Sequence, residues 1–288
     1  MTQTYDVAVL ENQGRRNYQE DSHSVAVLEQ YEANLVIVAD GMGGHAAGDI
    51  ASQSAVQAFQ REFKDGIEPP LRTQLNRALF RANNALKDQL EENPDYSGMG
   101  CTLIGAVFRP GSLRWVSVGD SIIYLVRGGR AERVNADHSL APQIDAQLQS
   151  GDLTEDEARN HPDRSALVSA LMGKKMSLVD LPEEELELNP GDWVIIASDG
   201  IETLEPAEVA ALVGQNIDIR ASDMARLLMQ AVLDCNTPDQ DNVTIAAVKI
   251  DEAAPVAAVS SGSVARRPAY LEAEPEAPSR EPVYETKK

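Results

Sequence analysis

Short segments rich in valine and isoleucine are the feature that most constrains the fold of this chain. They are five to nine residues long and are bounded by Gly, Pro, Asn and Asp, which predicts β-strands. The predicted strands are residues 6–10, 24–29, 34–39, 102–108, 114–119, 122–127, 192–198 and 242–250. The sequence Arg127-Gly-Gly-Arg130 at the end of one of them predicts a tight hairpin turn.

Apolar residues at helical spacing occupy two long segments, roughly 48–64 and 71–91. Because the two segments are consecutive, we expect an antiparallel helix pair. A shorter helix is predicted to begin at Thr154, where Glu157 completes a capping box, and another is predicted over 222–235. Strand hairpins around helix pairs predict an α+β fold built in layers, rather than a regular series of βαβ crossovers.

The composition changes near residue 251. The last 37 residues hold 5 of the 15 prolines and a single leucine. Such a segment has too few apolar residues to form a core. We therefore expect one folded domain over residues 1–251, followed by a disordered tail rich in Pro, Ala and Glu over 252–288.

The chain is strongly acidic, with 25 basic and 46 acidic residues and a net charge of −21. This argues against nonspecific binding to nucleic acids or to anionic membranes, both of which favour basic surfaces. An acidic chain suits a protein that binds divalent cations, although solubility alone would also explain the charge.

Cys101 and Cys235 are too few for a disulfide framework, which favours the reducing cytoplasm. The N-terminus lacks the basic and apolar regions of a signal peptide. No apolar stretch approaches the ~18 residues that a helix needs to span a bilayer. We therefore expect a soluble, cytoplasmic protein.

Carboxylates stand beside the ends of several predicted strands. They are Asp40, Asp120, Asp199, Asp241 and the pair Glu20-Asp21. Carboxylates buried together repel one another unless protons or cations neutralise them, and all-oxygen ligand sets select hard ions such as Mg²⁺ and Mn²⁺. A single Asp-Gly pair is more simply a turn. The repetition of Asp-Gly after two similar apolar strands favours a metal site.

Arg16 lies shortly before the acidic pair Glu20-Asp21. The planar guanidinium is the side chain best suited to hold phosphate oxygens. An arginine beside a carboxylate cluster is what a metal-dependent phosphoester hydrolase needs. Arg15, by contrast, is interpreted as a surface ion-pair residue.

Together these residues resemble the bacterial metal-dependent protein phosphatases of the phosphatase 2C type. The resemblance covers about residues 5–250, and the motifs occur in the family's order. They are Gly14-x-Arg16-x-x-x-Glu20-Asp21, Asp40-Gly-Met-Gly-Gly-His45-x-x-Gly48, Gly100-Cys-Thr102, Gly119-Asp-Ser121, Asp137-His-Ser139, His161-Pro162, Ser198-Asp-Gly200 and Asp241-Asn242.

The resemblance implies a four-layer αββα sandwich, in which two mostly antiparallel β-sheets are flanked by antiparallel helix pairs. It also implies two Mn²⁺ or Mg²⁺ ions at one end of the sandwich, and a weakly bound third ion. The implied ligands are Asp40 as the bridge, the Gly41 carbonyl, Asp199 and Asp241, with Glu20 and Asp21 in the first or second shell and Asp120 at the third ion. Arg16 is implied to bind phosphate, and residues 140–170 match a mobile flap.

The implied activity is hydrolysis of phosphoserine and phosphothreonine on proteins. A hydroxide between the two ions attacks phosphorus in line, and no phosphoenzyme forms. The implied partners are phosphorylated proteins and a cognate bacterial serine/threonine kinase. We expect a monomer that binds no nucleic acid.

Three positions depart from the family pattern. Ile122 replaces a common arginine, and Cys101 replaces a common threonine and is interpreted as a small buried residue. Met42 stands where eukaryotic relatives place a catalytic histidine. His45 is then a candidate general acid, but a structural role for this loop histidine remains an open alternative. His138 and His161 are interpreted as structural.

The main alternative is a pseudophosphatase, which would have the same fold and bind phosphoproteins without turnover. It predicts the loss of a core metal carboxylate, and none is missing from the sequence. A cysteine-based phosphatase is excluded, because neither cysteine begins a Cys-x5-Arg motif.

Overall fold

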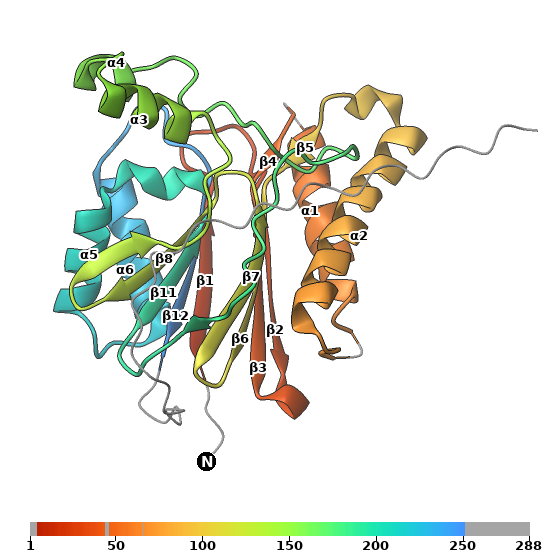
Figure 1. Ribbon diagram of the computed structural model, residues 1–288, viewed down its shortest axis with the longest axis horizontal. Helices are drawn as coiled ribbons and strands as arrows, with labels where there is room; N and C mark the ends of the chain where they lie inside the picture. Colours follow the sequence, from red (N-terminus) through yellow and green to blue (C-terminus); the bar gives the residue numbers. More distant parts are fainter. Residues whose placement is uncertain (1–4, 44–45, 65, 251–288) are drawn as a thin grey trace, which may run out of the picture.

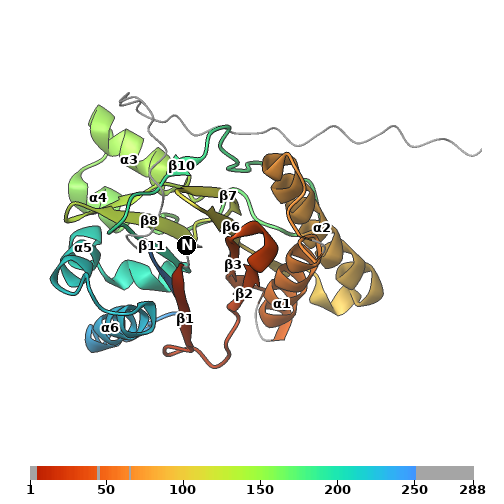
Figure 2. The same cartoon turned by 90° about the horizontal axis from the view of Figure 1, so that it is seen from below.

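The computed structural model describes residues 5–43, 46–64 and 66–250. Two β-sheets face each other and helices cover both outer faces, so the predicted four-layer αββα sandwich is confirmed (Figure 1). Helices α1 and α2 cover one sheet, and α5 and α6 cover the other (Figure 2). The predicted tail 252–288 lies outside the described residues.

Every strand pairing in the two sheets is antiparallel among the described residues. The first sheet has the order β1-β12-β11-β8-β9, and the second has the order β10-β7-β6-β3-β2. Their strands are β1 Asp6–Asn12, β2 Ser22–Leu28, β3 Ala33–Ala39, β6 Leu103–Arg109, β7 Ser112–Val118, β8 Ile122–Arg127, β9 Arg130–Arg133, β10 Leu186–Glu187, β11 Trp193–Ala197 and β12 Val243–Lys249. The short strands β4 Gly41–Met42 and β5 Gly100–Cys101 pair separately. The eight predicted strands are thus confirmed to within two residues at each end, as is the hairpin at 127–130.

The helices that cover the sheets were largely predicted. They are α1 Ala46–Arg61, α2 Leu71–Glu92, α5 Pro206–Gln215 and α6 Ala221–Asp234. Helix α4, Glu155–Arg159, has the predicted capping box: Thr154 Oγ1 accepts from the Glu157 amide, and Glu157 accepts from the Thr154 amide. Among the described residues, no helix combines the length and apolar character that crossing a bilayer requires.

Two helices were not predicted, α5 and α3, which spans Ala141–Ser150. Helix α3 buries only Ile144 among its described residues, so its sequence has no apolar stripe to indicate a helix. It ends at Gly151, whose φ of 82° gives a left-handed cap that favours glycine. Helices α3 and α4 lie within the segment 140–170, at the end of the sandwich beyond β7 and β8 (Figure 1).

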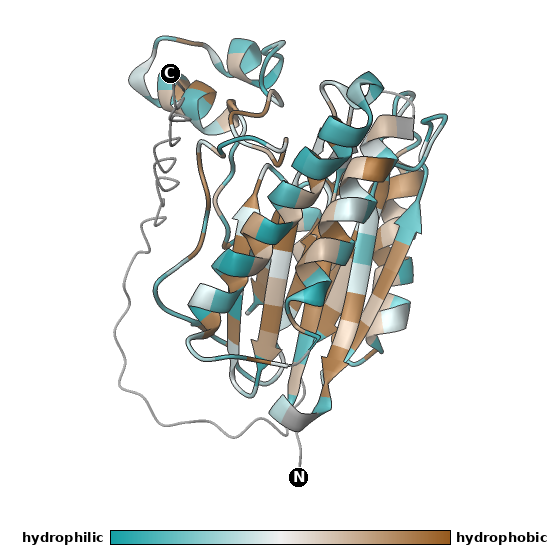
Figure 3. Ribbon diagram, turned by 90° about the vertical axis from the view of Figure 1, so that its right-hand side faces the viewer, coloured by the Kyte–Doolittle hydropathy of each residue, from teal (hydrophilic) through white to brown (hydrophobic). Residues whose placement is uncertain are grey.

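The core has three parts because the central strands are buried on both faces. In β3, Leu35 and Ile37 point towards α1 and α2, while Val36 and Val38 point towards the other sheet. This two-sided burial explains why the strand reads as a continuous apolar run rather than an alternating one. Figure 3 shows the same division from outside, with brown strands beneath helices whose outer faces are largely teal.

Gly105 in the middle of β6 allows α1 to lie close to its sheet. A Cβ at this position would lie 2.1 Å from Cζ of Phe59, which is fully buried. We expect Gly105→Ala to reduce the free energy of unfolding by about 1–3 kcal/mol through overpacking. Urea unfolding should show a smaller penalty in a Phe59→Leu background, where the ring is gone. Equal penalties in both backgrounds would contradict this explanation.

Candidate metal centre

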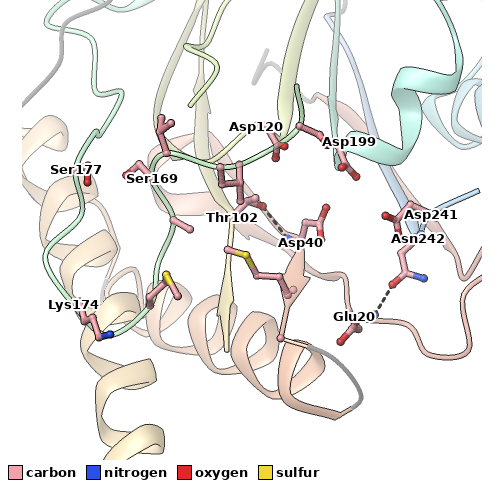
Figure 4. Close-up of a pocket in the computed structure, with 18 of the residues that line it drawn as sticks. Glu20, Asp40, Thr102, Asp120, Ser169, Lys174, Ser177, Asp199, Asp241 and Asn242 are labelled. Atoms are coloured by element: carbon pink, nitrogen blue, oxygen red, sulfur yellow. Dashed lines mark hydrogen bonds between the residues drawn. The ribbon is translucent and has the colours of Figure 1, made fainter. Parts of the chain in front are cut away.

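The predicted carboxylates come together at one end of the sandwich (Figure 4). Because neighbouring strands are antiparallel, the end of one strand lies beside the start of the next, and residues far apart in sequence meet there. A cavity of about 690 Å³ at this end is lined by Glu20, Asp40, Asp120, Asp199 and Asp241, together with Arg16 and Gly41. Asp21 is buried and does not line the cavity.

Each carboxylate is placed by the strand beside it. Asp40 joins β3 to β4, and Asp120 lies in the turn between β7 and β8. Asp199 begins the 3-10 helix η3, Asp199–Thr203, directly after β11. Asp241 precedes β12, and the pair Glu20-Asp21 precedes β2.

Asp40 is fixed by Thr102. The Asp40 amide donates to Thr102 Oγ1 at 3.0 Å, and the Thr102 amide donates to the Asp40 carbonyl at 2.8 Å. Thr102 Oγ1 also lies 2.7 Å from Ser121 Oγ, beside Asp120. The motifs Gly100-Cys-Thr102 and Gly119-Asp-Ser121 therefore connect the two carboxylates. The sequence indicated the motifs but not this role of Thr102.

Asn242 fixes the loop that carries Arg16. Its Oδ1 accepts from the Glu20 amide at 2.8 Å, and its Nδ2 donates to the carbonyls of Gln13 and Tyr18, each at 2.9 Å. A single buried amide thus holds both ends of the loop. The sequence marked Asn242 only as the neighbour of Asp241.

Gly41 is required by close packing. A Cβ on Gly41 would lie 2.2 Å from the Gly48 carbonyl oxygen and 2.5 Å from that of Glu20. The Gly41 amide also donates to the Glu20 carbonyl at 3.1 Å. Here glycine lets three backbone segments meet beneath the cavity. The binding of an ion by the Gly41 carbonyl stays a prediction.

Asp21 supports the cavity from below. Its Oδ2 accepts from Ser198 Oγ and Thr244 Oγ1, both at 2.8 Å. These hydroxyls belong to the motif Ser198-Asp-Gly200 and to β12, so Asp21 ties together the segments that carry Asp199 and Asp241. Asp21 does not line the cavity, and whether it would contact an ion directly or only support the other carboxylates stays a prediction.

Several of these carboxyl groups have raised pKa values. Burial raises the pKa of Asp120 to about 7, with a further contribution from Asp199. Burial also raises the pKa of Asp21 to about 7, against the hydrogen bonds from Thr244 and Ser198. The pKa of Asp40 is raised well above its ordinary value by burial and by the charges of Asp199, Asp21 and Asp120.

The pKa values of Asp199 and Glu20 are raised as well. For Asp199, burial and the charge of Asp241 raise the pKa, whereas a hydrogen bond with Asp40 lowers it. For Glu20, burial raises the pKa and the charge of Arg16 lowers it. The cluster thus carries more negative charge than its surroundings neutralise.

Several carboxylate oxygens fit a bound cation. Glu20 Oε1, Asp21 Oδ1 and Asp199 Oδ1 are buried and have no hydrogen-bond partner among the described residues. Buried charged oxygens without partners are costly, and hard divalent ions would satisfy them. Within the described residues, no group of three or more Asp, Glu, His or Cys side chains is already arranged so that it could hold a metal ion. The assignment of individual ligands therefore stays a prediction.

The other predicted residues have different fates. Arg16 lines the cavity with its side chain 54% exposed, and its Nη2 bonds Asp241 Oδ2. His45 lies outside the described residues. Cys101 is fully buried, which raises the pKa of its thiol and agrees with its interpretation as a small core residue. Burial lowers the pKa of His138 to about 4, and its Nδ1 accepts from the Gly119 amide.

Sequence comparison identifies the relatives of this chain. A family model described as protein phosphatase 2C matches residues 12–240. The serine/threonine protein phosphatase PstP of Mycobacterium tuberculosis is 32% identical over 216 residues, which are 75% of this chain and 40% of that protein. A putative protein phosphatase 2C-type of Streptococcus pyogenes is 32% identical over 218 residues, which are 74% of this chain and 85% of that protein.

A solved structure has the same fold. It is the catalytic domain of the serine/threonine protein phosphatase PstP in complex with two manganese ions. It aligns with a TM-score of 0.71 and 27% identity, covering 86% of this chain and 98% of that one. The family match over most of the chain, the shared fold and the convergent carboxylates lead to one conclusion: this chain belongs to the protein phosphatase 2C family.

Proposed function

We propose that this chain is a metal-dependent protein phosphatase that hydrolyses phosphoserine and phosphothreonine in proteins. The observation that carries the proposal is the cavity in which Glu20, Asp120, Asp199 and Asp241 lie around Asp40, with Arg16 at the edge. The raised pKa of Asp40 shows that this site lacks neutralising charge. Family membership supports the same activity. The chain spans about two fifths of the length of its mycobacterial relative, and we propose that it has the phosphatase activity for which that protein is named.

Two Mn²⁺ or Mg²⁺ ions are the proposed cofactors, with Asp40 between them and the Gly41 carbonyl at one. Asp199 and Asp241 hold the other ion, Glu20 and Asp21 support the pair, and Asp120 binds a weaker third ion. Bound ions would supply Lewis acidity that polarises the phosphate and makes water more acidic. Within the chain itself, Thr102 and Asn242 keep Asp40 and Glu20 in place by accepting hydrogen bonds from their backbone amides.

Arg16 is proposed to bind the oxygens of the substrate phosphate. Its guanidinium now bonds Asp241, so a cation at Asp241 would free its planar fork for a phosphoryl group. The side chain is more than half exposed and can turn without disturbing the core. His45 as the general acid remains part of the sequence-based hypothesis.

The proposed partners are phosphorylated proteins and a bacterial serine/threonine kinase that this chain would oppose. The net charge of −21 speaks against nucleic-acid binding. Cys101 and Cys235 are both free thiols, which suits a cytoplasmic location. We propose a cytoplasmic monomer on these grounds.

The decisive test is hydrolysis of an aryl phosphate and of a phosphothreonine peptide with Mn²⁺, with and without EDTA. We expect turnover with Mn²⁺ and at least a hundredfold loss in chelator or in Asp199→Ala, because the cluster loses its cations or an essential ligand. Full activity in EDTA, or an unaffected variant, would refute the mechanism. Binding of the phosphopeptide without any turnover would favour the pseudophosphatase.

A further inference from the structure

One wall of the cavity carries positive charge that the proposed reaction does not use. The turn Met172–Lys175 lines the cavity and places Lys174 and Lys175 at its edge. Figure 4 shows Lys174 on the opposite side of the cavity from Asp199, Asp241 and Glu20. These two lysines and Arg16 are the cationic side chains among the described residues that line it.

The backbone of this turn is fixed on both sides. Before it, Leu171 exchanges two backbone hydrogen bonds with Cys101 of β5, at 3.0 and 2.9 Å. Leu171 and, after the turn, Met176 are buried in the core beneath α1 and α2. The turn is therefore anchored by an apolar side chain at each end.

Asn83 of α2 fastens the middle of the turn. Its Oδ1 accepts from the amides of Met172 and Gly173 at 3.2 and 3.0 Å, and its Nδ2 donates to the Lys174 carbonyl at 2.7 Å. Asn83 is buried, and these three side-chain hydrogen bonds all go to the turn. These hydrogen bonds fix the backbone of the turn in one conformation.

Gly173 brings the turn directly against α2. Its φ is +67°, and a Cβ would lie 2.7 Å from the Lys87 Cα. Only glycine meets both conditions without strain. The chain thus builds a rigid backbone platform from which two long, flexible cationic side chains extend.

The two ammonium groups have no carboxylate partner within the described part of the chain. Neither Lys174 nor Lys175 forms an ion pair or a side-chain hydrogen bond there, although the chain carries 46 acidic residues. Both side chains are exposed to the solvent of the cavity mouth. Two adjacent unpaired cations on a fixed platform would attract an anionic group of a bound molecule.

We propose that Lys174 and Lys175 form a second anion subsite that selects the substrates of this phosphatase. The subsite takes an anionic group that lies near the scissile phosphate on the same peptide, either an acidic side chain or a second phosphate. The proposal rests on the proposed function, because the phosphate to be hydrolysed occupies the carboxylate side with Arg16. The acidic walls would otherwise repel such a peptide.

The test uses three phosphothreonine peptides, with neutral flanks, with glutamate flanks and with a neighbouring phosphoserine. We measure kcat/KM for each peptide and for an aryl phosphate, which has no flanking residues. The affinity of each peptide is measured by fluorescence anisotropy with Mn²⁺ present. We expect the wild-type chain to prefer at least one anionic peptide by about tenfold, the effect of one well-placed charged contact. High salt should weaken the preference.

The informative variant is Lys174→Gln/Lys175→Gln. Its ratio of kcat/KM for the anionic peptide to kcat/KM for the neutral peptide should fall close to one. The matched control is Lys64→Gln/Arg226→Gln, which removes two exposed positive charges away from the cavity and should keep the ratio. Selective loss with the glutamate peptide or with the doubly phosphorylated peptide identifies which anion the subsite takes.

Two results would overturn the subsite. One is a wild-type chain without any preference. The other is a lysine variant in which all substrates, including the aryl phosphate, weaken together at a constant ratio, since the lysines would then hold the scissile phosphate itself. If the wild-type chain hydrolyses nothing with Mn²⁺, the proposed phosphatase function fails, and the anisotropy ratios still decide whether the lysines select anionic peptides.

Discussion

Replacing Asp40 by asparagine is expected to abolish Mn²⁺-dependent turnover and, at the same time, to raise the melting temperature of the metal-free protein. The loss of activity should reach about 10³-fold, because a preorganised charge at the reacting centre is removed. The gain in stability follows from the electrostatics. In the metal-free protein, removal from solvent raises the pKa of Asp40 well above the ordinary value, and the charges of Asp199, Asp21 and Asp120 raise it further. A neutral amide escapes that repulsion and should contribute about 1–3 kcal/mol at neutral pH.

The control for this prediction is a second buried aspartate outside the cluster. Asp192 is buried, and its carboxylate accepts from Arg127 Nε at 2.8 Å and from Arg127 Nη2 at 2.6 Å. Asp192→Asn removes a charge that this guanidinium balances, so it should not raise the melting temperature. Differential scanning calorimetry in EDTA compares the two variants. A drop in stability for Asp40→Asn, or equal gains for both variants, would show that the cluster is not under like-charge repulsion.

Most of the fold could be predicted because its central strands are buried on both faces and are therefore apolar along their whole length. A strand such as β3 is buried on both faces, so Leu35, Val36, Ile37 and Val38 are all apolar and their segment stands out from its neighbours. Among the helices that cover the sheets, α1, α2 and α6 have apolar spacing that predicted them, whereas α5 was not predicted. Helix α3 could not be predicted in this way, because Ile144 is its single buried residue among those described.

The carboxylates of the candidate site could be predicted from the sequence, but the residues that hold them in place could not. Aspartates after strands are visible in the sequence, whereas Thr102 and Asn242 look like ordinary polar residues until the segments they join are brought together. Gly41 was predicted to admit an ion, and the structure adds the close approach of Glu20 and Gly48 as a reason for glycine. Asn83 gave no signal at all, because its three partners lie about 90 residues later in the chain.

The stability of the metal-free protein should fall as pH rises from 6.5 to 8, and the stabilisation by Mn²⁺ should grow over the same range. Asp21 and Asp120 have pKa values of about 7 in the folded chain against an ordinary 3.8. The folded state therefore holds protons that the unfolded state has already released, so stability is lost as pH rises through 7, by up to about 1.4 kcal/mol per pH unit for each such proton. The loss levels off towards pH 8, where the folded state has released them too.

The lower limit of that range is set by His138, whose pKa is lowered by burial to about 4 from an ordinary 6.5. The contribution of His138 has the opposite sign, since stability is lost as pH falls below 6.5, and it is fully present above that value.

Mn²⁺ competes with the protons for the carboxylates, so it should bind more tightly at pH 8 and raise the melting temperature more. Thermal melts in EDTA and in Mn²⁺ at each pH measure both trends, and Asp120→Asn should flatten the metal-free slope. If the melting temperature of the metal-free protein instead rises between pH 6.5 and 8, the carboxyl groups do not hold protons as proposed. The electrostatic reason for this cavity to bind divalent ions would then be lost.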